Sequence, residues 1–245
     1  MTFRVCSYNI QEGGGDRLAA LTGVIGHLQP DALALVEAND RAVAERLAGE
    51  FDMHLVFGEA NCAAHIAWLS RFPILHWENY HPLTLAKTLL AIEIAWSGVP
   101  LHLFATHLGS RWDRPQPATE IPVILDRLRR LGDVPHILVG DCNALAPQDP
   151  VGTRPDGVVK RGDAVEGSPR LAIRALLDAG YTDCYRALHS QEPGYTYPAT
   201  HPWLRLDHVF ASSQLAIHLA ACDVGSDAAE AHSASDHLPL WASFR

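Results

Sequence analysis

Six places in the sequence put polar side chains of catalytic type at the end or at the start of an apolar run. The residues are Asn9, Glu37, His107, Asp141 with Asn143, Asp207, and Asp236 with His237. Together they offer carboxylates, amides and imidazoles, and no thiolate. Hard oxygen donors of this kind suit Mg²⁺ or Mn²⁺ better than zinc. Because magnesium held by one or two carboxylates keeps positions for water and a phosphate, the set predicts phosphoryl chemistry.

Each residue of this set, taken alone, also has a purely structural interpretation. An Asn that follows a strand is commonly a turn residue, a Glu at a strand end is commonly solvated, and a single His107 is commonly a partly buried histidine. The stretch Gly140-Asp141-x-Asn143 can be a tight turn closed by an Asx hydrogen bond. Taken together, the six positions favour a catalytic site, because Glu37 and Asp141 follow runs so apolar that both residues are expected at the mouth of the protein core.

Short β-rich runs bounded by Gly, Pro or charge dominate the chain. Strands are expected over residues 3–10, 32–37, 65–70, 89–96, 101–108, 136–141, 205–212, 215–224 and 238–244. Because strand ends converge at one edge of a sheet sandwich, the polar residues beside these runs are expected to meet in one cleft.

Helical patterns lie between some of these strands. They are expected from Asp16 to Leu28, from a cap at Asn39 or Asp40 through Ala48 with Gly49 as the stop, from about Pro117 to Leu131 before Gly132, and over the stretch SPRLAIRALLDAG. In the last of these, Ser168 is the expected N-cap, Pro169 the first helical residue, and Gly180 lies just past the end. No repeat or linker separates two cores in the sequence, so we expect one domain over residues 1–245.

One segment, residues 145–167, differs from the rest because it is rich in Pro, Gly, Asp and Arg and lacks periodicity. Loops of this length are uncommon inside compact domains. Two interpretations remain open, a surface insertion and a functional loop. The position of the segment, directly after Asp141 and Asn143, favours the functional loop.

The chain has 245 residues and a net charge of −9 with its histidines neutral. A protein that grips long nucleic acids usually carries a basic stripe, which replaces the released counterions. The only short basic clusters here are Arg127/Arg129/Arg130 and Lys160/Arg161, and we expect both to be solvated surface. The charge therefore weighs against a dedicated DNA-binding protein without excluding a nuclease.

The five cysteines are odd in number, widely spaced and without a Cys-x-x-Cys pair. This pattern argues against a disulfide framework and a zinc knuckle, and it favours a reducing compartment. The N-terminus, MTFRVCSYNI, contains Arg4 and lacks the apolar core of a signal peptide, and no apolar run approaches the length of a membrane span. We therefore expect a soluble, cytoplasmic protein with no membrane span and no obligate protein partner.

The motifs SYNIQ, LVE, THL, GDCNA, RLDHVF and SDHLP resemble, in order and spacing, those of the endonuclease/exonuclease/phosphatase superfamily. This group includes AP endonucleases, pancreatic-type deoxyribonuclease, neutral sphingomyelinases, inositol polyphosphate 5-phosphatases and poly(A) deadenylases. Each motif is weak alone, but six in the same order over residues 7–239 are a strong signal. The resemblance implies an α+β fold, namely a four-layer αββα sandwich of two packed, mostly antiparallel β-sheets flanked by helices. It places the site at one end of the two sheets.

The resemblance also implies an enzyme, a Mg²⁺- or Mn²⁺-dependent phosphoric ester hydrolase. In such an enzyme the metal is held chiefly by Glu37, and Asn9 and Asp236 contribute directly or through water. The ion polarises a phosphoryl oxygen and stabilises charge on the leaving oxygen.

The same resemblance implies five catalytic residues. Asp141 positions or deprotonates the attacking water, and Asn143 binds the phosphate or orients Asp141. His237 faces the phosphate and is kept protonated or oriented by the carboxylate of Asp207. His107 occupies the position of a second histidine, or a tyrosine, that contacts the phosphate.

Three features depart from patterns within the superfamily. AP endonucleases have an acidic residue where this chain has Gln11, and a tyrosine where this chain has His107. The deoxyribonuclease and sphingomyelinase branches have a histidine at the position of His107, as this chain does. After THL the family often carries Arg and Gln on a helix, whereas GSRWDRPQPATEIP is rich in proline. Arg111 in this segment is a candidate contact to the phosphate.

The segment GYTYPATHPWLRLDH corresponds to the loop that shapes the substrate pocket in this superfamily. Its aromatic and imidazole side chains, Tyr197, His201 and Trp203, could stack on a substrate or could pack against the rim of the sandwich. Trp203 is the candidate substrate-binding residue.

From the charge and the absence of a basic insertion, we expect a phosphodiesterase or phosphatase that acts on a small or non-DNA phosphoester. A DNA endonuclease or exonuclease is the alternative, since a nuclease with an acidic surface is not excluded. A non-catalytic binding module of the same fold is a third reading. The presence of Glu37, Asp141, Asn143, Asp236 and His237 argues against it.

Overall fold

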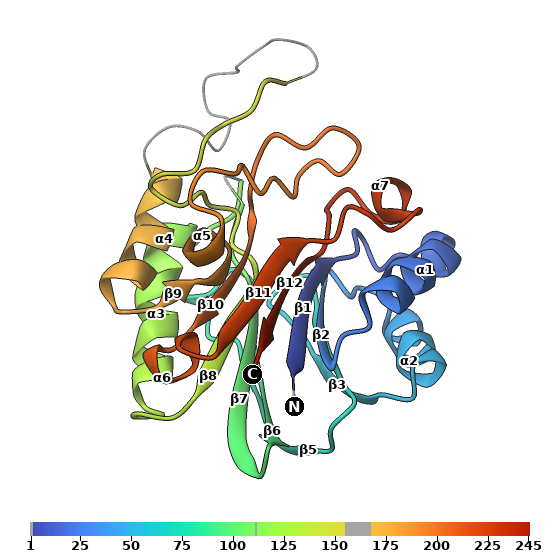
Figure 1. The fold of residues 1–245 in the computed structure, drawn as a ribbon, viewed down its shortest axis with the longest axis horizontal. Helices are drawn as coiled ribbons and strands as arrows, with labels where there is room; N and C mark the ends of the chain where they lie inside the picture. The colour runs from blue at the N-terminus through green and yellow to red at the C-terminus, as the bar shows by residue number, and fades with distance from the viewer. Residues whose placement is uncertain (1, 111, 155–167) are drawn as a thin grey trace.

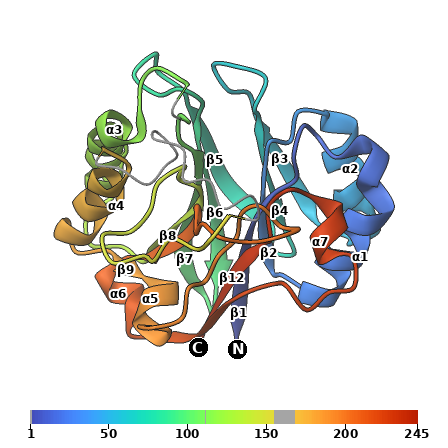
Figure 2. The ribbon, with the colours of Figure 1, turned by 90° about the horizontal axis from the view of Figure 1, so that it is seen from above.

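Two β-sheets pack face to face in the computed structural model, which describes residues 2–110, 112–154 and 168–245. Helices lie on the outer side of each sheet, so the molecule has four layers in the order helix, sheet, sheet, helix (Figure 1). The view from above shows the same layers edge-on (Figure 2). The predicted α+β sandwich is confirmed by this arrangement.

One sheet, here sheet A, contains the first four strands and the last two, hydrogen-bonded in the order β11-β12-β1-β2-β4-β3. Its strands are β1 (Phe3–Asn9), β2 (Ala32–Val36), β3 (His54–Gly58), β4 (Ile66–Ser70), β11 (Leu219–Val224) and β12 (Leu240–Phe244). The β1–β2 pair is parallel, and the other pairs are antiparallel.

The other sheet, sheet B, has the order β5-β6-β7-β8-β10-β9. Its strands are β5 (Ile74–Tyr80), β6 (Leu89–Trp96), β7 (Val99–His107), β8 (His136–Asp141), β9 (Thr182–Asp183) and β10 (Asp207–Ala211). Here too one pair, β7–β8, is parallel and the others are antiparallel.

The helices divide between the two outer faces (Figure 2). Beside sheet A lie α1 (Leu18–Leu28), α2 (Arg41–Glu50) and α7 (Ala231–Ala234), with the short 3₁₀ turn η1 (Gly15–Arg17) leading into α1. Beside sheet B lie α3 (Pro117–Arg129), α4 (Ser168–Asp178), α5 (Cys184–Leu188) and α6 (Ser213–Ala216). Local signals begin two of them, because the Asp40 side chain accepts from the Ala42 amide at the start of α2 and Pro117 opens α3.

The core explains why several runs are apolar throughout. Every residue of β2 and β8 is buried, because each strand lies between the opposite sheet on one face and a helix layer on the other. Trp68 on β4 is fully buried in the inner layer, and its Nε1 donates to the carbonyl of Leu90 on β6 at 3.0 Å. This bond ties sheet A to sheet B.

The parallel pairs determine where the polar residues go. Parallel strands finish at the same edge of a sheet, so Asn9 and Glu37 meet after β1 and β2, as do His107 and Asp141 at the ends of β7 and β8. Antiparallel neighbours start at that same edge, and Asp207, the first residue of β10, lies opposite Asp141. This is the end of the sandwich away from the two termini (Figure 1).

Some predicted boundaries were wrong. The run over residues 215–224 is a strand only from Leu219, because residues 213–216 form α6. Gly49 does not stop α2, which continues to Glu50, since a glycine on the open side of a helix costs little when the opposite face is packed. The edge strands β3, β5 and β9 and the short helices α5, α6 and α7 were not predicted.

The predicted loop over residues 145–167 is only partly covered by the structure. Its residues 145–154 contain no helix or strand, and residues 155–167 lie outside the described part. The five cysteines are all free, and only Cys62 is exposed. No described helix combines the length and the apolar character needed to cross a membrane.

Candidate active site

Asn9 joins the two sheets at the centre of the site. Its Nδ2 lies 3.2 Å both from Oε1 of Glu37 and from Oδ2 of Asp141, and it donates to both carboxylates. Its Oδ1 accepts from the backbone N–H of Gln11 at 3.0 Å. Since Asn9 is only 1% exposed, these bonds fix its amide in one orientation.

Glu37 follows β2 in a left-handed backbone conformation, with φ of 57°. Non-glycine residues rarely adopt this region, and such strain collects at functional sites. Gln11, Glu12 and Asn143, which lie in the neighbouring segments, also have positive φ. The second oxygen of Glu37, Oε2, accepts from the Glu12 amide at 3.0 Å. The half-buried carboxylate is therefore held at the site by one backbone amide and by the Asn9 side chain.

Asp236 enters from the segment before β12. The neighbouring Ser235 Oγ donates to the carbonyl of Asn9 at 2.6 Å and accepts from the amide of His237 at 3.3 Å. Burial raises the pKa of Asp236, and the charge of Glu37 raises it further against the opposing charge of His237. We call Asn9, Glu37 and Asp236 the carboxylate side of the site.

Asp141 is the most connected residue of the site. Its Oδ1 accepts from the Asn143 amide at 2.8 Å, so the Asx bond considered for this stretch is present. Its Oδ2 lies 3.2 Å from Asn9 Nδ2, 3.4 Å from His107 Nε2 and 3.7 Å from His237 Nε2. Burial raises the pKa of Asp141 to about 6, although the charge of His237 opposes this.

Gly140 allows β8 to approach β7 just before Asp141. A Cβ atom at this position would lie 1.8 Å from the carbonyl oxygen of Thr106, and the φ of Gly140 is +143°. The stretch considered as a tight turn begins inside β8, so Gly140 lies in the last part of a strand and only the residues after Asp141 turn. The lack of a side chain at Gly140, and not a turn, permits the close approach.

His237 and Asp207 form a buried pair. His237 Nδ1 lies 2.8 Å from Asp207 Oδ2, and both side chains are at most 6% exposed. Burial alone would lower the pKa of His237, but the carboxylates of Asp207 and Asp141 outweigh it and raise that pKa to about 10. The ring of Tyr197 packs at 4.8 Å from the imidazole. The imidazole is thus charged at neutral pH and oriented with Nε2 toward Asp141.

His107 has the opposite character. Burial lowers its pKa well below the usual value, and the positive charges of Lys87 and His237 act in the same direction. Lys87 is itself buried, and its Nζ donates to the carbonyl of Leu108 at 2.9 Å. The same carbonyl accepts from Asn143 Nδ2 at 3.0 Å. The site therefore pairs a charged imidazole with a neutral one.

The structure brings eight of the ten predicted site residues to one end of the sandwich. Besides the carboxylate side, they form what we call the histidine side, which consists of His107, Asp141, Asn143, Asp207 and His237. One carboxylate beside a charged imidazole, with two amides, can orient a water and bind a phosphoryl oxygen.

The sequence profile of the Endonuclease/Exonuclease/phosphatase family matches residues 6–237. The chain belongs to this family. Its members are phosphoester hydrolases, and the matched range contains every residue of both sides of the site. No curated protein matches the chain.

Solved structures of this family share the fold. An AP endonuclease from Archaeoglobus fulgidus is 21% identical, with 99% of each chain covered and a TM-score of 0.77. The 3′ phosphatase NExo from Neisseria, bound to a product DNA hairpin, is 22% identical, with 99% of each chain covered and a TM-score of 0.76. TDP2 from D. rerio, complexed with a single-strand DNA product, is 19% identical, with 100% of this chain and 99% of that chain covered and a TM-score of 0.73. At these identities the likeness concerns the fold.

The donors of the carboxylate side fit a hard divalent ion. Within the described residues, neither Glu37 nor Asp236 has an ion pair with Lys, Arg or His. The described residues also contain no group of three or more His, Cys, Asp or Glu side chains placed to hold a metal ion by themselves. Zinc with four protein ligands does not match this set. Two carboxylates beside the Asn9 amide match Mg²⁺ or Mn²⁺, because such ions keep several waters and take few protein ligands.

The structure adds residues that the sequence alone did not indicate. Ser235 and Lys87 hold backbone groups next to site residues, and Arg17 does the same after its run of glycines. Arg205 lies in the RLDH motif and is fully buried between two carboxylates. A buried Arg or Lys has no local pattern of its own, so position inside a recognised motif was the only available signal.

The two candidate substrate contacts have different outcomes. Arg111 lies outside the described residues. Trp203 is 8% exposed and packs with Leu145, Leu204 and Leu206, and the guanidinium of Arg154 lies 5.5 Å from its ring. This placement favours the rim-packing alternative for Trp203.

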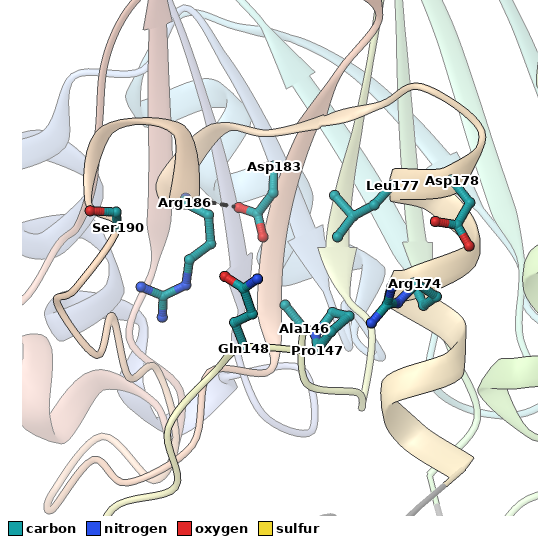
Figure 3. Close-up of a pocket in the computed structure, with 9 residues that line it drawn as sticks. All are labelled: Ala146, Pro147, Gln148, Arg174, Leu177, Asp178, Asp183, Arg186 and Ser190. Carbon is teal, nitrogen blue, oxygen red and sulfur yellow. Dashed lines mark hydrogen bonds between the residues drawn. The ribbon is translucent and has the colours of Figure 1, made fainter.

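A pocket of about 220 Å³ lies outside this site (Figure 3). It is lined by residues of α4 and α5 and by the segment after Asn143, and it contains none of the ten predicted site residues. Two of its lining residues, Asp183 and Arg186, belong to the buried ion cluster around Arg205. The pocket therefore opens onto the outer side of that cluster.

Proposed function

We propose that this protein is a Mg²⁺- or Mn²⁺-dependent hydrolase of a small or non-DNA phosphoester, either a phosphodiesterase or a phosphatase. The observation that carries the proposal is the position of Asp141, whose Oδ2 lies within 3.7 Å of Asn9, His107 and His237. A single carboxylate oxygen thus links the carboxylate side to the histidine side. Membership of the family supports the same class of reaction.

Glu37 and Asp236 would hold the metal, with Asn9 contributing directly or through water. When bound there, the ion would polarise a phosphoryl oxygen and stabilise the charge of the leaving oxygen. The two carboxylates have no ion pair with Lys, Arg or His among the described residues, which supports a role for both in binding a cation.

Asp141 would take the proton from the attacking water. Its pKa of about 6 leaves it ionised at neutral pH and close to the pH range in which a general base is most effective. The backbone amide of Asn143 fixes one carboxylate oxygen, so the other is oriented toward the cleft. Asn143 would use its remaining amide hydrogen to bind the phosphate, because the other is donated to Leu108.

His237 would bind the phosphoryl group as an imidazolium. Its Nδ1 is held by Asp207, so Nε2 is the nitrogen that can donate into the cleft. A donor held in place before the reaction stabilises the charge that develops on the phosphoryl oxygens without reorganisation. His107, which is neutral, would add a second hydrogen bond without a second positive charge.

The preference for a small or non-DNA substrate rests on charge. The net charge is −9, and two described arginines near the site, Arg17 and Arg205, hold groups of the protein itself. Arg17 holds backbone carbonyls, and Arg205 is enclosed by Asp149 and Asp183. These guanidinium groups cannot replace counterions along a polyanion. One phosphate can still be drawn into the cleft by the metal and by His237.

Hydrolysis of DNA is the second candidate. Three solved family members with TM-scores of 0.73 to 0.77 are titled an AP endonuclease, a 3′ phosphatase bound to a DNA hairpin, and TDP2 with a single-strand DNA product. These titles describe those proteins, and the fold they share is compatible with either substrate class.

The test compares the two substrate classes with one protein preparation. Bis(p-nitrophenyl) phosphate and p-nitrophenyl phosphate would be assayed beside abasic duplex and plasmid DNA, with Mg²⁺ or Mn²⁺ at about physiological ionic strength. We expect turnover of a small ester that disappears in excess chelator and returns when metal is added. The Asp141→Asn protein, purified in parallel, controls for contaminating phosphatases.

Two results would contradict the proposal. Full turnover in excess chelator would remove the metal from the mechanism. Efficient nicking of DNA with sub-micromolar affinity, and no turnover of the small esters, would establish the nuclease alternative instead.

A further inference from the structure

Arg17 connects two segments that carry the carboxylate side. Its guanidinium donates to three backbone carbonyls, those of Ile10 at 3.2 Å, Ala234 at 2.7 Å and Gln11. Ile10 directly follows Asn9, and Ala234 lies two residues before Asp236. One side chain therefore links the end of β1 to the entrance of β12, although 217 residues separate Arg17 from Ala234.

A second bond strengthens the same connection. Ser235 Oγ donates to the carbonyl of Asn9 at 2.6 Å. Together the two side chains satisfy the carbonyls of three consecutive residues, Asn9 to Gln11, at the end of β1. Asn9 and Asp236 both lie outside the ladder between β1 and β12, so strand pairing does not join them directly and these side-chain bonds connect their segments.

An arginine at this position is unfavourable for a cation site on charge alone. The side chain is 21% exposed, and among the described residues it pairs with one carboxylate, that of Asp16, which is 86% exposed and strongly hydrated. A positive charge near a Mg²⁺ or Mn²⁺ site weakens binding by repulsion. The planar guanidinium nevertheless presents several donors in a fixed fork, which a lysine does not.

We propose that Arg17 is a positioning residue that sets the geometry of the divalent-metal site by holding the segments of Asn9 and Asp236 together. The proposal rests on the proposed metal-dependent function. Its electrostatic and geometric effects have opposite signs, so the direction of change in metal affinity separates them. Loss of the forked guanidinium donors of Arg17 would weaken binding of the divalent ion, whereas loss of the positive charge alone would strengthen that binding.

The experiment measures Mn²⁺ binding by electron paramagnetic resonance of the free ion and by titration calorimetry, independently of turnover. We expect Arg17→Met and Arg17→Lys each to raise the Kd for Mn²⁺ by about 10- to 100-fold, the range found for residues that orient metal ligands. Arg17→Lys is the decisive variant because it keeps the charge and removes the fork. Circular dichroism establishes that each variant is folded.

Arg4 provides a matched control at the other end of β1. Its guanidinium also donates to a backbone carbonyl, that of Leu28, and it lies 4.5 Å from the Trp241 ring. We expect Arg4→Met to lower thermal stability and to leave the Kd for Mn²⁺ unchanged. A general loosening of sheet A would affect both variants alike, and that result would overturn the proposal.

The outcomes also separate this proposal from the proposed function. If the wild-type protein binds Mn²⁺ and folded Arg17→Lys binds it equally well or more tightly, Arg17 is not a positioning residue and the metal site stands. If the wild-type protein binds no Mn²⁺, the metal site itself is absent and both proposals are wrong.

Discussion

The two sides of the site differ in how their charges are balanced. On the histidine side and behind it, buried charges have partners within the protein. His237 pairs with Asp207, and Arg205 lies between Asp149 and Asp183. On the carboxylate side, Glu37 accepts hydrogen bonds from the Asn9 side chain and the Glu12 backbone amide, and no cationic side chain within the described residues forms an ion pair with Glu37 or Asp236.

The cluster around Arg205 shows how completely a buried charge can be balanced by partners within the protein. Arg205 is fully buried and donates twice to Asp149 and twice to Asp183, at 2.7 to 3.1 Å. Arg186 adds a bond to Asp149 at 2.8 Å. Burial alone would raise the pKa of Asp183, but Arg205 outweighs it and holds that pKa well below the usual range. Arg205 lies two residues before Asp207, so its bonds to the cluster hold the start of β10 in place.

The difference indicates how the protein divides stability from function. Charges that are balanced internally contribute to a folded site that needs no ligand. Charges that are left unbalanced cost stability and become useful when a cation binds, because binding to the folded state alone stabilises it. Mutations should therefore have different effects on the two sides. Removing a balanced charge on or behind the histidine side should lower stability, and removing a carboxylate of the carboxylate side should lower the response to metal.

The largest effect is expected where the two sides meet. Asp141→Asn removes the proposed base while its amide can keep the bond to Asn143, so turnover should fall by about 10² to 10⁴-fold. Steady-state kinetics on a small phosphoester and a denaturation curve would check this. A near-normal rate on the true substrate would remove Asp141 from its assigned role.

A somewhat smaller loss is expected within the histidine side. Asp207→Asn weakens the acceptor that keeps His237 charged and oriented, and turnover should fall by about 10²-fold. Adding His237→Ala should cost much less than the product of the two single effects, since paired residues act as a unit. A double-mutant cycle in turnover measures this. Fully multiplicative losses would mean that the pair does not work as one group.

Arg205→Met tests the balanced cluster through stability. The substitution leaves Asp149 and Asp183 buried without their main partner, and breaking a buried pair in this way costs about 3–5 kcal/mol. Chemical denaturation gives the change in unfolding free energy. Arg130→Met is the matched control, because its pair with Asp126 is exposed and should change stability little. Equal effects of the two variants would show that the cluster contributes no special stability.

Glu37→Gln should give the smallest change in the metal-free protein. Removing one of two unbalanced carboxylates relieves repulsion, so stability should stay the same or rise by at most about 1 kcal/mol. The rise in Tm that Mn²⁺ gives the wild-type protein should disappear in this variant. A large destabilisation in metal-free buffer would contradict the view that this side is left unbalanced.

Much of the architecture could be predicted from local pattern. The runs ALALV and HILVGD are apolar throughout because β2 and β8 are covered on both faces. The edge strand β5 was missed for the opposite reason. It is largely exposed, with Leu75 and Trp77 more than half accessible, and carries no run of buried apolar residues. Hydrophobic patterning in a sequence indicates which segments are buried, so an exposed strand at the edge of a sheet is difficult to predict from it.

The sequence by itself determined which chemical groups stand beside each strand, and in what order. Polar residues after apolar runs, such as Glu37 and Asp141, are a local property, and strand direction then brings them to one edge. Tertiary structure alone decided which charges are balanced and which remain free for a cation. The bonds from Arg17 to Ala234 and from Arg205 to Asp149 join distant segments through backbone carbonyls or buried carboxylates. Such bonds depend on packing and distance, which residue type and spacing do not encode.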